Sequence, residues 1–334
     1  MKLLLTGDLQ FSEQVNLSRR TEAGTTTRLE DQVTCFNWIV QVGVKHSCEM
    51  MLALGDIFDN RTSVPIAVLD RAGRCFARAK EAFRGVLVLV GNHDAALRSS
   101  ALSSLQPLSG LATVIDRPRV IAEELAFVPW VEDDDAFRAG VGSVAKVKSA
   151  RFLFAHTLLE GIVPADVGRA VADLRASRWD RVFLGDVHAP IVVNKTVQYV
   201  GAPMQHHYGD AGGDRGVWIF DTTSSKLSFV LNETSPRFHL IKVRADLSAV
   251  REGDFVRVQV EDATAAHELA ALAGKRTRWV ENTTATDEAA PVSRLAVTSS
   301  DPYRTILKRY VEFREATPVS GLVDVGVEIM QEVT

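Results

Sequence analysis

The sequence VLVLVGNHD, at residues 86–94, joins five apolar residues to a glycine and three polar residues. A short apolar run that ends at glycine is typical of a strand buried on both faces of its sheet. Asn92, His93 and Asp94 would then lie just beyond the carboxyl end of that strand, where open α/β sheets form their sites.

Four further apolar runs end in the same way. Polar residues follow each of them: Asp8 and Gln10 after Leu3–Leu5, Asp56 and Asp59 after Met50–Leu54, His156 after Phe152–Ala155, and Asp186 and His188 after Val182–Leu184. A chance scatter of aspartate and histidine would not follow the strand ends, so we expect the five ends to converge on one crevice.

Helical patterns at Leu29–Val44 and Pro65–Phe83 separate the early strands, whereas the chain beyond residue 190 is rich in strand-like runs. This order predicts an α/β core of β-sheets flanked by helices, either as an open sheet or as a sandwich. We expect residues 1–235 to form this domain.

The remaining chain predicts a smaller domain and a tail. Residues 236–300 combine alternating apolar positions at 255–260, a helical stretch at 263–272 and a polar loop at 281–291, which is typical of an α+β domain. Residues 301–334 contain an amphipathic helical pattern, Pro302–Glu315. We expect this tail either to pack on its own domain or to bind a partner.

Composition limits the function classes. The chain has 334 residues, 46% of them hydrophobic, and a formal net charge of −4, so it is globular and not a basic nucleic-acid-coating protein. Cys35, Cys48 and Cys75 show no CxxC spacing, which predicts buried thiols in a reducing compartment. The first apolar run is too short for a signal peptide or a membrane span, so we expect a cytoplasmic protein without a membrane partner.

The strand-end residues have the chemistry of a two-metal site. Two hard divalent ions need several oxygen ligands, a carboxylate that can bridge them, and imidazoles to complete each shell. Such a pair activates a hydroxide and binds a phosphoryl oxygen. One Gly-Asp pair alone would indicate only a turn or a helix cap, but five ordered motifs favour the metal site.

The same motifs carry a resemblance. GDLQ (7–10), GDIFDN (55–60), GNHD (91–94), FAHTLLEG (154–161) and GDVHAP (185–190) are similar to the ordered motifs of calcineurin-like metallophosphoesterases. LEDQ at 29–32 and the stretch QYVGAPMQHHYGDAGGDRGVWIFD at 198–221 resemble the SbcD nuclease family of bacteria and phages. The resemblance covers residues 1–240 well and the remainder weakly. It implies a metallophosphoesterase sandwich with a capping domain.

The resemblance also implies the metal ligands. One ion would take Asp8, Gln10, Asp56 and His188, and the other would take Asp56, Asn92, His156 and Asp186, with Asp56 bridging. Gln10 and Asp186 stand where the family has histidines, and Gln10 either coordinates weakly or does not coordinate. Because these changes replace nitrogen by oxygen donors, we expect manganese to serve, with more tolerance of magnesium than in relatives with the full histidine set.

His93 and Asp94 are the candidate catalytic residues. In the family, the histidine matching His93 contacts the scissile phosphate and can protonate the leaving oxygen, which requires an imidazole that titrates near the working pH. We expect Asp94 or Asp59 to orient its ring. A purely structural histidine is the alternative.

The implied function is a DNA nuclease, acting as a double-strand exonuclease and a single-strand endonuclease within an SbcCD-like repair and recombination complex. The tail would then dock on an SMC-like ATPase of the SbcC type, and the nuclease subunit would form a homodimer. The chain has no GxxxxGK[ST] motif, so any ATP use belongs to the partner.

Several alternatives stay open at this point. A phosphatase or a nucleotide phosphodiesterase could use the same core, and the substituted ligands favour a weakly catalytic DNA-binding subunit. The loop with Arg19, Arg20 and Arg28 could contact phosphate or be a solvated loop. The basic cluster at 275–279 could contact DNA. The pair His206 and His207 could be structural or could face the substrate.

Overall fold

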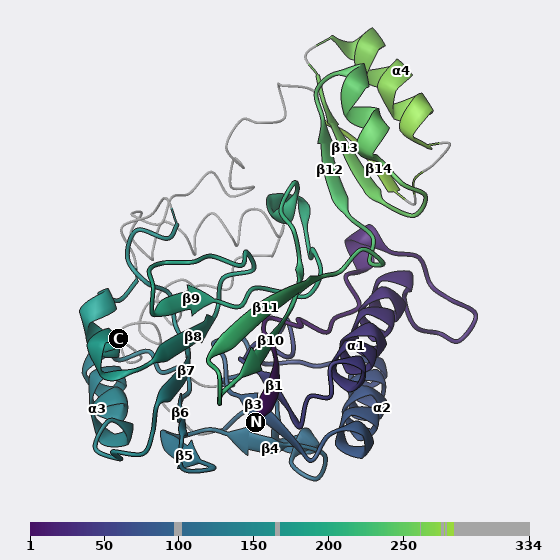
Figure 1. Ribbon diagram of the computed structural model, residues 1–334. Coiled ribbons are helices and arrows are strands. Elements are labelled where there is room, and N and C mark those ends of the chain that lie inside the picture. Colours follow the sequence, from purple (N-terminus) through teal and green to yellow (C-terminus); the bar gives the residue numbers. More distant parts are fainter. Residues whose placement is uncertain (97–101, 164–167, 261, 275–276, 278, 284–334) are drawn as a thin grey trace, which may run out of the picture. The chain divides into compact units, whose positions relative to one another are not determined.

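The computed structural model describes residues 1–96, 102–163, 168–260, 262–274, 277 and 279–283 (Figure 1). The chain divides into two compact units. The larger unit comprises Met1–His239, Arg251–Phe255 and a short piece that begins at Thr277. The smaller unit comprises Leu240–Val250 and, of the later described residues, 256–260, 262–274 and 280–283.

The larger unit contains a six-stranded and a five-stranded sheet. The first has the order β11-β10-β1-β2-β3-β4, in which β1 to β4 run parallel and β10 and β11 pair antiparallel. Its strands are β1 (Lys2–Thr6), β2 (Met50–Ala53), β3 (Gly85–Leu89), β4 (Thr113–Ile115), β10 (Gly216–Asp221) and β11 (Lys226–Leu231).

The second sheet has the order β5-β6-β7-β8-β9, with β6 to β9 parallel and β5 antiparallel at its edge. Its strands are β5 (Arg119–Ile121), β6 (Leu125–Val128), β7 (Phe152–His156), β8 (Arg181–Gly185) and β9 (Val197–Tyr199). Short 3-10 helices lie at Val15–Leu17, Gln106–Leu108, Val171–Leu174, Ala176–Arg178, Tyr208–Asp210 and Arg244–Ala249.

The alternation of side chains along the strands builds the layers of this unit. In β1, Leu3 and Leu5 join the core between the two sheets, whereas Leu4 joins the core beneath the helices at Thr27–Lys45 and Ile66–Ala82. In β7, Phe152 and Phe154 face the other sheet in the same way. The strands are apolar on both faces because both faces are covered, which explains the continuous apolar runs in the sequence.

Helices cover the outer faces of both sheets (Figure 1). α1 (Thr27–Lys45) and α2 (Ile66–Ala82) pack on the six-stranded sheet, and α3 (Asp134–Val144) packs on the five-stranded one. α1 begins where the Thr26 side chain accepts a hydrogen bond from the Leu29 backbone. The predicted α/β class is therefore confirmed, and the arrangement is the sandwich, not the open sheet.

The smaller unit is α+β, as the sequence predicts. Its sheet has the order β12-β13-β14, and one apolar cluster joins β12 and β13 to α4. The bounds are β12 (Phe238–Ile241), β13 (Phe255–Gln259), α4 (Ala263–Gly274) and β14 (Trp279–Thr283). The predicted polar loop at 281–291 is wrong at its start, because residues 281–283 pair as the end of an edge strand. The predicted tail at 301–334 and the basic residues Lys275, Arg276 and Arg278 lie outside the described residues.

The three cysteines are buried and free, as predicted. Burial raises the pKa of the Cys35 thiol to about 12, so it behaves as an apolar side chain. Among the described residues, no helix is both long and apolar enough to cross a membrane.

Replacing Phe154 with alanine should destabilise the larger unit by about 3–5 kcal/mol, the usual cost of removing a buried phenylalanine. Phe154 is 0% exposed, and its ring stacks on Phe127 at 5.1 Å and on Phe183 at 5.4 Å between ring centroids. Chemical denaturation followed by fluorescence measures the change. Ile66→Ala is the control, because Ile66 is 86% exposed, and its effect should stay within about 0.5 kcal/mol. Equal effects of the two substitutions would contradict the assigned core.

Candidate metal centre

The predicted strand-end motifs meet at one edge of the sandwich. β1, β2 and β3 are parallel neighbours in one sheet, and β7 and β8 are parallel neighbours in the other, so their carboxyl ends point to the same side within each sheet. Backbone hydrogen bonds continue the pairing past the strands. The Asp8 amide donates to the Gly55 carbonyl at 3.1 Å, and the Gln10 amide donates to the Asp56 carbonyl at 2.9 Å.

Two hydrogen bonds join the sheets at this edge. Nδ1 of His156, on the five-stranded sheet, donates to the Leu54 carbonyl at 2.6 Å. The Asp186 amide donates to Asp8 Oδ1 at 3.1 Å. These hydrogen bonds join the motifs of Asp8, Asp56, His156 and Asp186 to one another through backbone atoms, and they fix the directions of those side chains.

Polar side-chain atoms converge around the Asp56 carboxylate. One terminal atom of the Asn92 amide lies 2.9 Å from His156 Nε2, and 2.9 and 3.1 Å from the two carboxylate oxygens of Asp56. With its nitrogen in this place, the amide donates to the Asp56 carboxylate. With its oxygen there, the group needs a cation, which is either a protonated His156 ring or a bound metal ion. His156 Nε2 lies 3.5 Å from Asp56 Oδ1 and 3.6 Å from Asp186 Oδ1.

Asp8 adds a further carboxylate to this cluster. Ligand atoms of Asp8, Asp56 and His156 lie within 4.8 Å of one another, and the three residues are buried. Asp8 Oδ2 is buried and has no hydrogen-bond partner among the described residues. Burial raises the pKa of the Asp8 carboxyl to about 7, with His156 opposing the rise and Asp56 adding to it.

The carboxylates around His156 also change its pKa. Burial lowers the pKa of His156, but the carboxylates of Asp56, Asp186 and Asp8 raise it well above its ordinary value. A buried group of carboxylates with an amide oxygen and an imidazole is the set of ligands that hard divalent ions take. The residues present therefore fit the predicted metal.

The backbone at this site is in the left-handed region, which few non-glycine residues adopt. The φ angles are 48° at Asp8, 45° at Gln10, 52° at Asp56 and 92° at Asp186. Strained backbone of this kind occurs at functional sites, where the surrounding structure over-determines it.

Gly91 allows the closest approach. A Cβ at this position would lie 2.2 Å from Asp56 Oδ1 and 2.5 Å from the Asp56 amide nitrogen. Only glycine therefore lets the third motif pass beside the Asp56 carboxylate.

His93 lies next to this cluster. Its amide donates to Asp56 Oδ1 at 2.9 Å, and its Nδ1 donates to the backbone carbonyl of Asp59 at 2.6 Å. Of the two residues expected to orient the ring, Asp59 does so, through its backbone carbonyl and not through its carboxylate. Its Nε2 remains for another partner.

The Asp94 side chain binds backbone amides of two motifs. Its carboxylate is fully buried and accepts from the amides of Ile57, Phe58 and Gly91 at 3.0, 3.2 and 3.0 Å. Burial raises its pKa to about 7, and the nearby charge of Asp56 adds to the rise. Asp94 thus ties the third motif to the second, and its predicted catalytic role remains a prediction.

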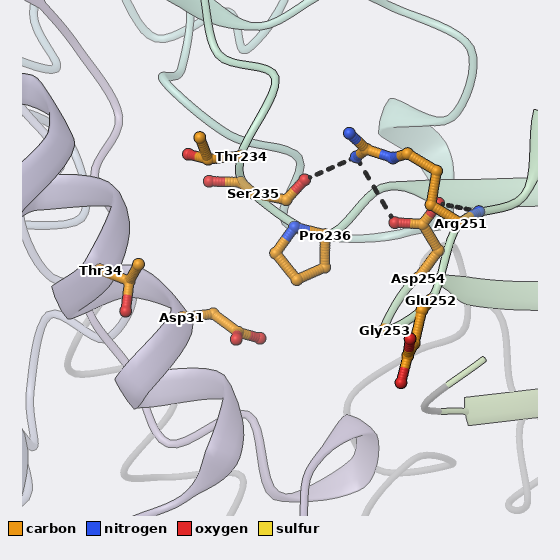
Figure 2. A pocket seen from close by; sticks show the side chains of 9 residues that line it. All are labelled: Asp31, Thr34, Thr234, Ser235, Pro236, Arg251, Glu252, Gly253 and Asp254. Atoms are coloured by element: carbon orange, nitrogen blue, oxygen red, sulfur yellow. Dashed lines mark hydrogen bonds and ion pairs between the residues drawn. The ribbon is translucent and has the colours of Figure 1, made fainter. Parts of the chain in front are cut away.

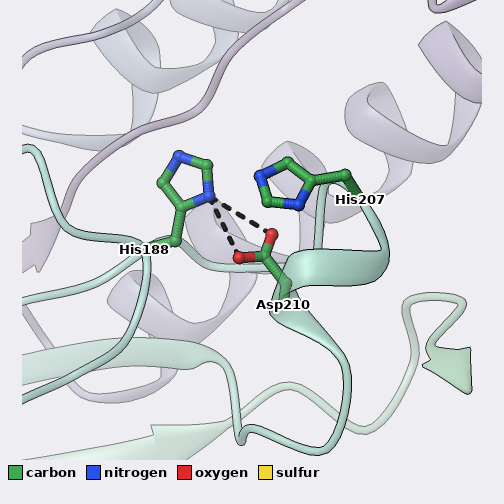
Figure 3. Close-up of side chains that lie close together, drawn as sticks. All are labelled: His188, His207 and Asp210. Atoms are coloured by element: carbon green, nitrogen blue, oxygen red, sulfur yellow. Dashed lines mark hydrogen bonds and ion pairs between the residues drawn. The ribbon is translucent and has the colours of Figure 1, made fainter. Parts of the chain in front are cut away.

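His188 lies in a second group with His207 and Asp210, in which ligand atoms of the three residues lie within 4.8 Å of one another (Figure 3). Nδ1 of His188 is 3.2 Å from both carboxylate oxygens of Asp210. Burial lowers the pKa of His188, but the Asp210 hydrogen bond and the charge of Asp8 raise it above its ordinary value. His188 is thus within electrostatic reach of Asp8.

The structure brings together most of the predicted ligands through direct contacts, namely Asp8, Asp56, Asn92, His156 and Asp186. Gln10 is buried, and its amide donates to the Asp56 carbonyl. The ligand assignment as a whole remains a prediction.

Sequence reasoning missed the roles of His206 and Asp210. His206 is buried, and its Nε2 donates to the Asp8 carbonyl at 2.8 Å. Its amide donates to Asp210 Oδ2 at 2.8 Å. Burial and the charges of His188 and Arg28 lower the pKa of His206 well below its ordinary value, so the ring is neutral. The stretch QHHYGD was the signal, but nothing in its spacing showed these contacts.

The predicted phosphate contact of Arg28 is wrong. Arg28 is fully buried and donates to the Gln14 side chain and to the Gln205 carbonyl. Its guanidinium also lies 5.2 Å from the ring centroids of Phe238 and Phe255. Arg19 and Arg20 are exposed, so the alternatives for that loop remain open for them.

A surface pocket elsewhere in the larger unit does not suit a phosphate (Figure 2). Its single cationic lining residue, Arg251, donates to the Ser235 carbonyl at 3.0 Å and lies 3.6 Å from Asp254. Its acidic lining residues are Asp31, Glu252 and Asp254.

Gly91→Ala should weaken manganese binding on the order of 10–100-fold, as happens when the support of a metal ligand is disturbed. The added Cβ must displace Asp56, as its distances show. Isothermal titration calorimetry with Mn²⁺ measures the affinity. Gly73→Ala in α2 is the matched control, because its Cβ would meet nothing within 4 Å. Unchanged affinity in Gly91→Ala would show that the Asp56 carboxylate does not hold an ion here.

Comparisons with known proteins give one curated relative and several solved structures. No family model matches the chain. Exonuclease subunit 1 of Enterobacteria phage T4 is 22% identical over 213 residues, which cover 61% of this chain and 62% of that protein. The chain thus matches less than two thirds of this relative's length.

Several solved structures are similar to the chain at lower sequence identity. A dimetal phosphatase from Danio rerio is 13% identical, with a TM-score of 0.43, covering 66% of this chain and 91% of that one. The Pseudomonas putida nuclease MPE is 15% identical, with a TM-score of 0.32, covering 68% of this chain and 87% of that one. A phosphoesterase from E. coli is 13% identical, with a TM-score of 0.33, covering 69% and 98%.

The predicted resemblance to nuclease subunits is confirmed by the phage relative. The chain is similar to the T4 exonuclease subunit over part of each protein.

Proposed function

We propose that this chain is a metal-dependent phosphodiesterase, and more narrowly the nuclease subunit of a DNA repair or recombination complex of the SbcCD type. The observation that supports it best is the buried group of Asp8, Asp56 and His156, whose ligand atoms lie within 4.8 Å of one another. Asp8 Oδ2 in this group has no hydrogen-bond partner among the described residues. The similarity to an exonuclease subunit supports the choice of a nuclease.

Different residues of the chain would bind the metal ions, donate a proton and hold the loops together. Two divalent ions, when bound, would polarise a phosphoryl oxygen and supply a nucleophilic hydroxide. Asp8, Asp56 and Asp186 would hold them with His156, His188, Asn92 and, more weakly, Gln10. A His93 ring protonated on both nitrogens would donate the Nε2 proton to the leaving oxygen, while the Asp59 carbonyl accepts from Nδ1 and orients the ring. Asp94 would keep the two loops that carry these residues together.

The finer parts of the proposal rest on the sequence motifs. Mn²⁺ would be the preferred ion, with Mg²⁺ accepted, because Gln10 and Asp186 offer oxygen in place of nitrogen. The substrate would be DNA, cut as double-strand ends and as single strands. The partner would be an SMC-like ATPase bound by residues 301–334, and the subunit would form a homodimer in the cytoplasm of a bacterial cell. Residues 1–235 would be the nuclease domain, and 236–300 the capping domain that contacts DNA.

A second candidate is a weakly catalytic subunit that binds DNA and regulates its ATPase. The observation that favours it is the substitution at two ligand positions, Gln10 and Asp186. A phosphatase or nucleotide phosphodiesterase would share the same metal chemistry and differ only in substrate. Substrate competition between DNA and small phosphate esters distinguishes these activities.

Asp56→Ala should abolish DNA hydrolysis, because Asp56 is the carboxylate around which the other ligands gather. The measurement is release of nucleotides from labelled DNA in the presence of Mn²⁺, together with a thermal melt that shows the variant is folded. Asp70→Ala is the control, since Asp70 is exposed on α2 and pairs only with surface charge there. Cleavage near the wild-type rate by Asp56→Ala, in preparations free of contaminating nuclease, would reject the two-metal mechanism.

His93→Ala should retain both ions and lower turnover by about 10²–10⁴-fold, the usual effect of removing a general acid. The ring contacts a carbonyl oxygen, whereas the amide of His93 contacts Asp56 and survives the substitution. Calorimetry with Mn²⁺ and single-turnover cleavage measure the two properties separately. His267→Ala, at an exposed position of α4, is the control. A loss of bound manganese in His93→Ala would make His93 a ligand and not a proton donor.

A further inference from the structure

The residues behind His188 form a connected polar cluster that the proposed mechanism does not use (Figure 3). Asp210 is 6% exposed and sits at the end of a short 3-10 helix, Tyr208–Asp210. Its carboxylate faces Nδ1 of His188 at 3.2 Å and accepts from the His206 amide at 2.8 Å. Arg215 lies 3.2 Å from Asp210 Oδ1. Asp210 is therefore a buried anion surrounded by donors.

Donors surround the Asp210 carboxylate. The His206 amide donates to Oδ2 at 2.8 Å, and Arg215 lies 3.2 Å from Oδ1. Nδ1 of His188 lies 3.2 Å from both carboxylate oxygens, and a nitrogen that faces two acceptors carries the hydrogen. The lone pair of a neutral His188 ring is then on Nε2.

This group is not a separate metal site. Both Asp210 oxygens are already engaged by His188, by the His206 amide and by Arg215. His207 Nδ1 accepts a hydrogen bond from the Gly209 amide at 3.0 Å. A third ion would have to break these contacts and would lie beside the Arg215 cation.

The loop that carries His206 and Asp210 also contacts the motif of Asp8. His206, whose amide donates to Asp210, donates from its ring to the carbonyl of Asp8. The ring of His206 lies 5.1 Å from that of His188, with an interplanar angle of 70°. One segment thus holds the backbone of Asp8 and the ring of His188 in a fixed relation.

We propose that Asp210 is a positioning residue that holds His188 with Nδ1–H toward its carboxylate, so that Nε2 is presented as the ligand for the ion shared with Asp8. The proposal rests on the two-metal function above. Histidines that bind metals commonly donate their other nitrogen to a carboxylate, which fixes the tautomer and increases the basicity of the ligating nitrogen. Arg215 would keep the carboxylate in place.

The test is Mn²⁺ titration by calorimetry of the full chain and of the variants Asp210→Asn and Asp210→Glu. Asn keeps the size of the side chain but removes the charge and one acceptor, so one manganese site should weaken by about 10–100-fold while the other stays unchanged. Glu keeps the carboxylate and should restore most of the affinity. Thermal melts confirm that each variant is folded.

Asp254→Asn is the matched control. Asp254 is 1% exposed and pairs with His239 Nε2 at 2.8 Å, which is the same kind of pair outside the ligand motifs. Its replacement should lower stability without changing manganese affinity. Unchanged affinity in Asp210→Asn, equal losses in the Asn and Glu variants, or an equal loss in Asp254→Asn would each overturn the positioning role. If the wild-type chain binds fewer than two ions, the proposed two-metal function fails first, whatever the variants do.

Discussion

The buried carboxylates of Asp8 and Asp56, with His156 beside them, are the group that the rest of the larger unit must support. Carboxylates this close repel one another in a buried setting, where the dielectric screening of water is weak. The amides of His93 and Asp186 donate to Asp56 and Asp8, and the ring of His156 donates to the Leu54 carbonyl. A divalent cation bound here would offset the repulsion.

The hydrophobic core provides the rigidity that this geometry needs. Phe127, Phe154 and Phe183 stack in series between the sheets, and Phe152 and Phe183 each contact Phe220 from the opposite sheet. A close-packed interior resists small shifts of one sheet against the other. The strand ends therefore keep their spacing even though the site combines residues of both sheets.

Much of the fold could be predicted because its strands are buried on both faces. The runs at β1, β2, β3, β7 and β8 are apolar throughout, so periodicity alone indicates them. The edge strand β5 is exposed or half-buried along its length and gives no such signal. The choice between one open sheet and a sandwich depends on contacts such as Phe183 with Phe220, which join residues far apart in the chain.

The site was predictable in its residue types but not in its contacts. Glycine and polar residues after each strand identify Asp8, Asp56, Asn92 and His156. The burial of Arg28 could not be read from a polar segment, because it depends on Phe238 and Phe255 from a different part of the chain. The partner of His93 is a backbone carbonyl, and backbone groups have no sequence signature.

The separation of the site residues along the chain has a consequence for how the protein folds. The hydrogen bond between Asp186 and Asp8 spans 178 positions, and that between His156 and Leu54 spans 102. Contacts of such length close late, because the chain entropy that they cost is regained only once the intervening structure has formed. An unfolded chain offers no comparable set of ligands. A divalent ion held by these residues would therefore bind the native state and stabilise it by mass action, by about 2.7 kcal/mol at a hundredfold excess over its dissociation constant. Such an ion would bind after folding and would not start it.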